Sequence, residues 1–123
     1  MALVLDAGAL IAIERRDRTT IARLVRAHEN AEPVVTSAAV VAQVIRNCGR
    51  QVTLERVLAG IEEEPLDSEA ARRVGQLLAS SRTSDVVDAA LAVLAAPGDE
   101  VMTSDPKDLR TLLPQRSIKI TSV

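Results

Sequence analysis

The N-terminal stretch MALVLDAGALIA, residues 1–12, contains a short apolar run that ends on an acid and passes at once into a helical pattern. Residues 2–5 predict a buried strand, with Asp6 at its carboxyl end. Near the other end of the chain, EVMTSD (100–105) repeats this arrangement and closes on Asp105. Sites in open α/β sheets form at the carboxyl ends of the strands. We therefore expect Asp6 and Asp105 to lie close together at one edge of a sheet.

Composition indicates one folded domain spanning residues 1–123. The chain is 47% hydrophobic and 26% charged, which excludes a disordered chain and a membrane-embedded one. No apolar stretch approaches the ~20 residues of a transmembrane helix, and the first apolar run is too short for a signal peptide. A single cysteine cannot form an internal disulfide, so we expect a cytoplasmic protein with no membrane contact.

Charge and aromatic content limit how the protein could bind nucleic acid. The formal net charge of −2 argues against a broad basic surface but not against local basic patches. The chain has no Phe, Tyr or Trp, so it cannot stack bases on aromatic side chains. Contacts with phosphate, sugar and metal would have to provide any such binding.

Strand-like and helix-like segments alternate along the chain, which predicts an α/β fold with three layers: a central parallel sheet between two layers of helices. The segment 61–67 contains Pro65, which suits an edge strand. We expect the other strands at 2–5, 32–37, 101–104 and 117–123. Helices are expected at 8–14, from Thr19 or Thr20 onward, from Ala38 to a stop at Gly49, and at 51–59, 68–81, 85–96 and 106–112.

Each candidate acid also has a purely structural explanation. Asp6 could cap the first helix. Asp85 with Asp88 forms a D-x-x-D pattern that resembles a capping box. Asp105 precedes Pro106, as an N-cap does when proline begins the first turn. Capping explains each acid by itself, but not why all of them fall at one edge of the sheet.

Asp88 is the acid that capping explains least, because its neighbours on the helix are almost all apolar. A carboxylate there is unfavourable unless it is paired, near the exposed helix end, or bound to a cation. Asp85 lies on the same face one turn earlier, and a divalent cation would relieve the repulsion between the two. Carboxylates suit Mg²⁺ or Mn²⁺, which can activate water for attack on a phosphate. Thr103 and Ser104 could orient these ligands or hold a water.

Four segments in this order and at this spacing resemble the motifs of PIN-domain nucleases and, more narrowly, of VapC-type toxins from bacterial toxin–antitoxin pairs. They are LDAGALIA (5–12), TSAAVVAQVIR (36–46), SDVVDAALA (84–92) and MTSDPKDL (102–109). The resemblance covers nearly the whole chain and implies a parallel sheet in the order 3-2-1-4-5.

The resemblance also implies roles for particular residues. Asp6, Asp88 and Asp105 match the acids that bind Mg²⁺ or Mn²⁺ in the family, and Thr103 matches the threonine of its late T-x-D motif. Asp85 matches an additional acid that some members carry. Together these matches imply a metal-dependent endoribonuclease that acts as a toxin, cleaves RNA, forms a homodimer and binds a small antitoxin that blocks the acidic site.

Two positions depart from the family pattern. Gln43 stands where the family usually has Glu; its amide can offer an oxygen but no negative charge, so metal affinity should be lower. Gly8 stands where many members have a hydroxyl-bearing residue. Arg46 and Arg50 follow Gln43 at helical spacing and could contact substrate phosphates. Further candidates for phosphate contacts are Arg15, Arg16 and Arg82.

Two alternatives remain open. One is a catalytically weakened module of the same fold, with Gln43 in place of an acid, that binds an antitoxin or RNA. The other is a phospho-acceptor receiver domain, which needs an acid pair after the first strand, an acceptor Asp after the third and a Lys at the end of the fifth. Only Asp6, Asp67 and Lys119 come near these requirements.

Overall fold

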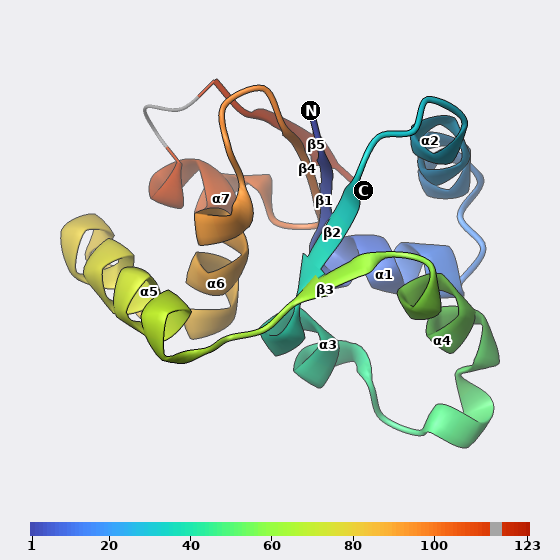
Figure 1. Ribbon diagram of the computed structural model, residues 1–123, viewed down its shortest axis with the longest axis horizontal. Helices are drawn as coiled ribbons and strands as arrows, with labels where there is room; N and C mark the ends of the chain where they lie inside the picture. The colour runs from blue at the N-terminus through green and yellow to red at the C-terminus, as the bar shows by residue number, and fades with distance from the viewer. Residues whose placement is uncertain (114–116) are drawn as a thin grey trace.

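The computed structural model describes residues 1–113 and 117–123, and a five-stranded parallel sheet forms its centre (Figure 1). The order across the sheet is β3-β2-β1-β4-β5, so the order implied by the resemblance is confirmed. The strands are β1 (Leu3–Leu5), β2 (Val34–Ser37), β3 (Glu62–Glu64), β4 (Glu100–Thr103) and β5 (Lys119–Ser122).

Helices cover both faces of the sheet, which confirms the three-layer α/β fold. Figure 1 shows α5, α6 and α7 on one side of the sheet and α1, α2 and α4 on the other, with α3 at the carboxyl end of the strands. No helix in the described ranges is both long and apolar enough to cross a membrane. The helices are α1 (Ala7–Glu14), α2 (Arg18–Glu29), α3 (Ala38–Val44), the 3-10 turn η1 (Cys48–Arg50), α4 (Val52–Ala59), α5 (Ser68–Ser81), α6 (Val86–Leu94) and α7 (Pro106–Leu112).

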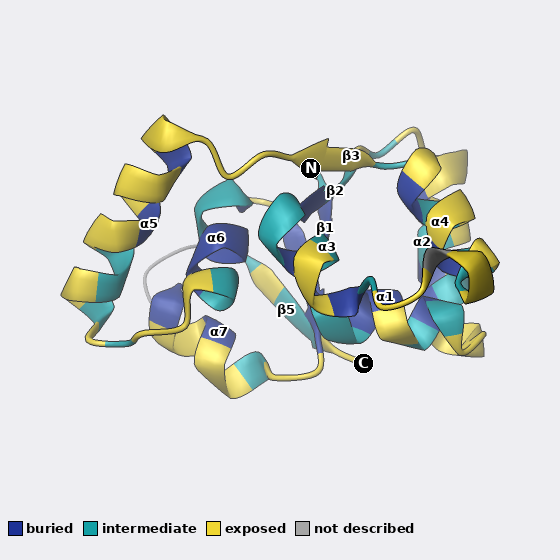
Figure 2. Cartoon of the chain, turned by 90° about the horizontal axis from the view of Figure 1, so that it is seen from below, coloured by how far each residue is buried: buried dark blue, intermediate teal, exposed yellow. Residues whose placement is uncertain are grey.

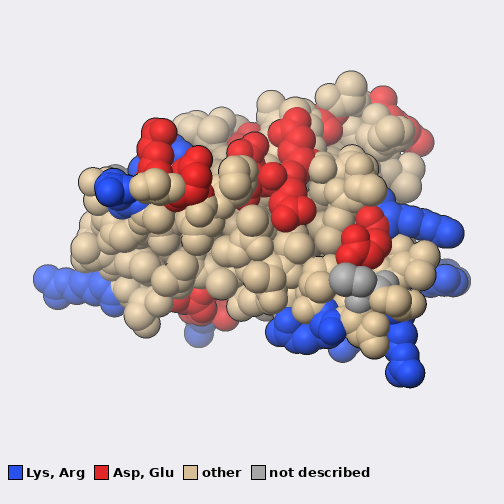
Figure 3. All heavy atoms as spheres, turned by 60° about the horizontal axis from the view of Figure 1, so that its bottom comes forward, with Lys and Arg blue, Asp and Glu red and all other residues tan. Residues whose placement is uncertain are grey.

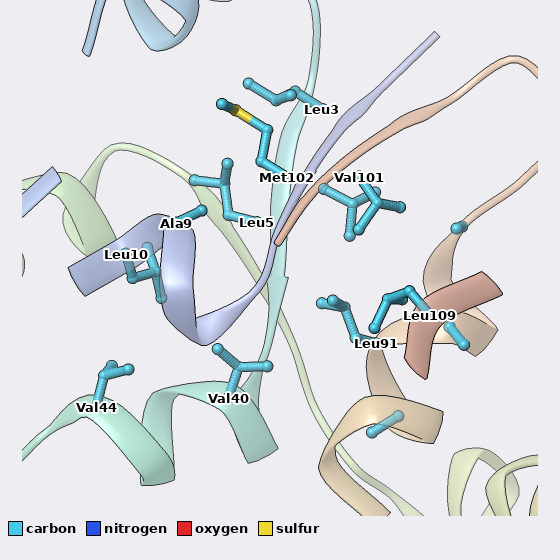
Figure 4. Close-up of a cluster of buried hydrophobic side chains, with 14 of the residues drawn as sticks. Leu3, Leu5, Ala9, Leu10, Val40, Val44, Leu91, Val101, Met102 and Leu109 are labelled. Carbon is cyan, nitrogen blue, oxygen red and sulfur yellow. The ribbon is translucent and has the colours of Figure 1, made fainter. Parts of the chain in front are cut away.

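The central strand β1 is buried on both faces. Side chains alternate between the two faces of a strand, and Figure 4 shows Leu5 and Met102 on the side of α1. Val101 points to the opposite side, toward Leu91 of α6 and Leu109 of α7. Asp6, which directly follows β1, is thus attached to a fully buried strand.

Helix α6 is the most buried of the helices that flank the site. Its middle residues Ala89, Ala90, Leu91 and Ala92 are all buried, and it packs against α3, α5 and α7. Small alanine side chains permit that many close neighbours. Figure 2 shows the contrast with α5, whose outer face is largely exposed.

Strand β3 lies at the edge of the sheet, as the segment around Pro65 predicted. Its three residues, Glu62–Glu64, are all exposed. A short edge strand that carries only carboxylates is protected against pairing with another chain, because a second strand would have to pack beside its negative charges.

The sheet order excludes the receiver-domain alternative, whose fold class has the order 2-1-3-4-5. Here β3 is at the edge and not beside β1. Asp67, the would-be acceptor, instead caps α5 by accepting a hydrogen bond from the Ala70 amide at 2.8 Å.

Helix α3 ends at Val44, and the prediction that it continues to Gly49 was wrong. The Gln51 side chain replaces the hydrogen bonds that a longer helix would make. Its Oε1 accepts from the amides of Arg46 and Asn47 at 2.8 and 2.9 Å. Its Nε2 donates to the Val44 carbonyl at 2.9 Å.

Helix α2 begins before the threonines that were predicted to cap it. Asp17 is the N-cap, and its carboxylate accepts from both the amide (3.0 Å) and the hydroxyl (2.7 Å) of Thr20. Aspartate is a stronger cap than threonine, so the helix gains two residues at its start.

A buried ion cluster at the amino end of the sheet fixes α2 against the strands. Arg23 of α2 contacts Glu100 of β4 at 3.1 Å and Glu32 at 2.8 Å. The hydroxyl of Thr121 in β5 donates to the second oxygen of Glu100 at 2.8 Å. Buried charges need such paired, hydrogen-bonded surroundings, and this cluster lies at the opposite end of the strands from Asp6.

Candidate active site

Asp6 is buried, with 5% of its surface exposed, directly after the last residue of β1. One carboxylate oxygen accepts from the Ala7 amide at 2.6 Å, at the start of α1. The other oxygen accepts from the Thr103 hydroxyl at 2.6 Å. The capping explanation is therefore confirmed for Asp6, and the same carboxylate is also tied to the neighbouring strand.

Thr103 connects the two strand-ending acids. The register of the parallel pair places Leu5 opposite Met102, so the next residues of the two strands, Asp6 and Thr103, stand side by side. The Thr103 hydroxyl donates to Asp6 and accepts from the Asp105 amide at 2.9 Å. The expectation that the ends of these strands lie together is thus met through one buried hydroxyl group.

Asp105 occupies the predicted N-cap position of α7, with Pro106 in the first turn, but its side chain does not cap the helix. It accepts no hydrogen bond from the first turn of α7, which lies within the described part of the chain. Instead it is hydrogen-bonded to the Asp108 side chain, and this bond, with the charge of Asp105, raises the pKa of Asp108. Asp108 was not among the predicted site residues, although its spacing of three from Asp105 could have identified it.

Asp88 is the point where the acids converge electrostatically. Its partial burial, together with the charges of nearby carboxylates, raises its pKa from 3.8 to about 6. The contributing charges, in decreasing order, belong to Asp85, Asp6, Asp108 and Asp105. The charges of the other three predicted acids, Asp6, Asp85 and Asp105, and of Asp108 thus all act on Asp88.

Asp85 is confirmed as a helix cap, and it also lies close enough to Asp88 to influence its ionisation. It caps α6, where its carboxylate accepts from the Asp88 amide at 2.9 Å, and its charge acts on Asp88. Asp85, Asp88 and Asp108 line a hollow of about 270 Å³, together with Thr83. Larger still is a hollow of about 580 Å³ between α2 and α4, but it lies at the amino ends of β2 and β3, away from the acids.

The polar and basic candidates on and after α3, which are Gln43, Arg46 and Arg50, are all exposed. Gln43 is exposed, and within residues 1–113 and 117–123 no hydrogen bond links it to the acids. Arg46 turns back on its own helix, where its guanidinium donates to the carbonyls of Ala42 and Ile45 at 3.2 and 2.8 Å. Arg50 is exposed in η1. Because α3 ends at Val44, the helical spacing that suggested a shared cleft for the two arginines does not exist.

Comparison with known proteins identifies the family. The model of the PIN domain matches residues 3–111. The chain belongs to the PIN domain family. No curated protein matches it.

Solved structures agree with this PIN domain over its whole length. One similar chain comes from the structure of VapBC2 from Rickettsia felis bound to a DNA fragment of the VapBC2 promoter. Its TM-score is 0.71 at 12% sequence identity, over 100% of this chain and 99% of that one. VapBC-5 from Mycobacterium tuberculosis, of the VapBC family of toxin–antitoxin systems, gives 0.59 at 25% identity, over 100% of both chains. DNA-bound VapBC from Salmonella typhimurium has a TM-score of 0.61 at 17% sequence identity, over 99% of this chain and 98% of that one.

The donor set of this PIN domain fits a small divalent cation. The converging groups are carboxylates with a hydroxyl group beside them, which are the oxygen ligands that Mg²⁺ and Mn²⁺ prefer. Among the described residues, no three acidic, His or Cys side chains already form a metal-binding group. Mg²⁺ is usually held by one or two carboxylates and several waters, so it does not require such a group in advance.

Replacing Thr103 with Val should destabilise the fold by about 1–3 kcal/mol. The change removes the hydroxyl that links the Asp6 carboxylate to the Asp105 amide, and both groups lose that hydrogen-bond partner. Urea unfolding of the metal-free protein measures this. Thr103→Ser keeps the hydroxyl and is the matched control. Equal stability of the Val variant and the wild type would contradict the connecting role of Thr103.

Asp88→Asn should stabilise the metal-free protein at pH 7. Asp88 ionises near 3.8 in the unfolded chain and near 6 in the folded one. The folded state therefore binds more protons between these values, and the contribution of Asp88 to stability is lost as the pH rises through about 6. The difference in melting temperature between variant and wild type should be largest at pH 7 and vanish near pH 4, measured with a chelator present. Glu69→Gln, at an exposed position on α5, controls for the change in net charge; a difference that does not depend on pH would refute this account.

Proposed function

We propose that this PIN domain is a cytoplasmic endoribonuclease that depends on a divalent cation, Mg²⁺ or Mn²⁺, and acts as the toxin of a type II toxin–antitoxin module. The observation that supports this most is the effect of the neighbouring acids on Asp88. Its burial and the charges of Asp85, Asp6, Asp108 and Asp105 raise its pKa to about 6. Perturbed carboxylates gathered at the ends of parallel strands are typical of functional sites.

Surface charge is consistent with binding through local contacts. On the face drawn in Figure 3, acidic side chains gather across the middle, and most basic ones lie toward the margins. A polyanion such as RNA is repelled by such a surface unless a cation stands between the carboxylates and the phosphate. The acidic site and a negatively charged substrate thus both favour a divalent cation.

In this proposal Asp6, Asp88 and Asp105 would hold the cation, with Asp85 and Gln43 assisting. The cation, when bound, would polarise the scissile phosphate and activate a water. Thr103 keeps the Asp6 carboxylate oriented through its hydroxyl hydrogen bond. Asp88 gives up its proton on cation binding, so affinity for the cation should fall as the pH drops below about 6.

Partners follow from the similar structures. Those structures are described as VapBC systems, in which toxin and antitoxin occur together, and this supports a small antitoxin as the partner of this chain. The resemblance further implies a homodimer.

Asp105→Asn should reduce metal-dependent cleavage of RNA by about 100-fold or more, because it removes a carboxylate from the cation while no helix cap is lost. Asp6→Asn should do the same. Cleavage is measured on single-stranded RNA with Mg²⁺ or Mn²⁺, beside Glu63→Gln, which removes an exposed acid from β3. Circular dichroism confirms folding, and undiminished cleavage by both Asn variants would refute the assignment.

A second candidate function has one specific observation in its favour. Gln43 brings no charge to the site, so the chain could be a weakened PIN module that binds an antitoxin or RNA without efficient cleavage. Gln43→Glu discriminates between the two. A gain of tenfold or more in cleavage supports a weakened enzyme, whereas no gain indicates that glutamine belongs to a working site; Gln76→Glu on exposed α5 is the control.

A further inference from the structure

Gly8 permits an unusually close approach between α1 and the segment that links β4 to α7. A Cβ atom at position 8 would lie 2.5 Å from the Ser104 Cβ and 2.8 Å from the Ser104 backbone nitrogen. The backbone nitrogen cannot move aside as a side chain can, so any larger residue at position 8 would push this segment away. The exposed Ser104 side chain is therefore held against α1, one residue after Thr103.

A groove of about 530 Å³ begins at this contact. It runs along the face of α1 formed by Gly8, Ile11, Ala12 and Arg15, which recur at the spacing of one helix face. This is not the face that packs into the core, because the buried residues of α1 are Ala9, Leu10 and Ile13. Ile11 lies on this outward face, which is why its side chain is 38% exposed.

The chemistry of the groove changes along its length. It starts with a hydroxyl at Ser104, continues over the apolar side chains of Ile11 and Ala12, and ends with the exposed guanidinium of Arg15, roughly 13 Å from Asp6 at 1.5 Å of rise per helical residue. Asp17 and Val123 also line it. The Asp17 carboxylate is engaged by Thr20 at the start of α2, and these bonds lower its pKa.

We propose that this groove holds one nucleotide of a single-stranded RNA next to the scissile phosphate, with Ser104 and Arg15 as its polar contacts. The inference rests on the proposed function, because it takes the acids as the place of cleavage. The volume lies in the range that accommodates a ligand the size of a nucleotide. The apolar middle contacts the ribose and base edge, since the chain has no aromatic side chain on which a base could stack.

Charge favours this side of the acids over the others. Asp85, Asp88 and Asp108 line the hollow on the side of α6 and α7, where an anion is repelled. The α3 side presents Arg46, but its guanidinium is engaged with its own helix. The groove along α1 thus offers a cation at Arg15 and a hydroxyl group at Ser104, and it begins beside Gly8, two residues after Asp6.

The test is photocrosslinking of RNA, which does not require cleavage. A photoreactive p-benzoylphenylalanine replaces Ile11 in the full chain, and the same residue replaces Val25, which is 48% exposed on α2, as the matched control. A 12-nucleotide single-stranded RNA of mixed sequence is irradiated with each protein in Mg²⁺. We expect at least about fivefold more crosslinking at position 11; equal yields would overturn the proposal.

Binding measurements add a second criterion. Arg15→Glu should weaken binding of the same RNA about tenfold, as loss of a charge-assisted contact predicts, whereas Arg26→Glu on α2 should change it less than twofold. Arg15→Gln should lower the salt dependence by about 0.7 in log–log slope. Equal effects of the two Glu variants would overturn the proposal.

The outcomes separate this inference from the proposed function. Selective crosslinking at position 11 without any RNA cleavage supports the groove and contradicts the nuclease. Cleavage that disappears in Asp105→Asn, together with equal crosslinking at both positions, supports the nuclease and overturns the groove. A double-stranded RNA that crosslinks as well as the single strand would also overturn it.

Discussion

The pairing of β1 with β4 is the constraint on which the site depends. Asp6 and Thr103 are 97 residues apart in sequence, and only the parallel register of these two strands places them side by side. The Thr103 hydroxyl then turns this proximity into a fixed geometry, because it donates to the Asp6 carboxylate and accepts from the Asp105 amide. Since β1 is buried on both faces, neither partner can shift without disturbing the core.

Gathering carboxylates at the ends of these strands opposes folding, and the surrounding structure offsets this. Asp88 lies in the first turn of α6, and the buried alanines that follow it anchor that turn against the core. The repulsion is concentrated on Asp88, whose raised pKa is the measure of it. In the proposed function, a cation that neutralised the acids would recover the lost stability.

Sequence was sufficient for features that depend on pattern and insufficient for those that depend on one side chain choosing a distant partner. The strand-ending positions of Asp6 and Asp105 followed from short apolar runs, and the α/β layers from their alternation with helices. The buried pair of Arg23 and Glu100 could not be predicted, because 77 residues separate them and each alone resembles a surface charge. The early end of α3 depends in the same way on the amide of Gln51, which competes with the helix for its own backbone groups.

The two departures from the family pattern acquire a common meaning once the acids are placed. Gln43 brings no charge on the α3 side, and Asp108 adds a carboxyl group beside Asp105 on the α7 side. The negative charge of the site is thereby displaced toward α6 and α7 and away from α1, where Gly8 lets Ser104 approach. A polyanion that enters between these sides meets less repulsion along α1. If RNA is the substrate, as we propose, the distribution of charge, and not the number of acids, would determine the direction from which its phosphates reach Asp6.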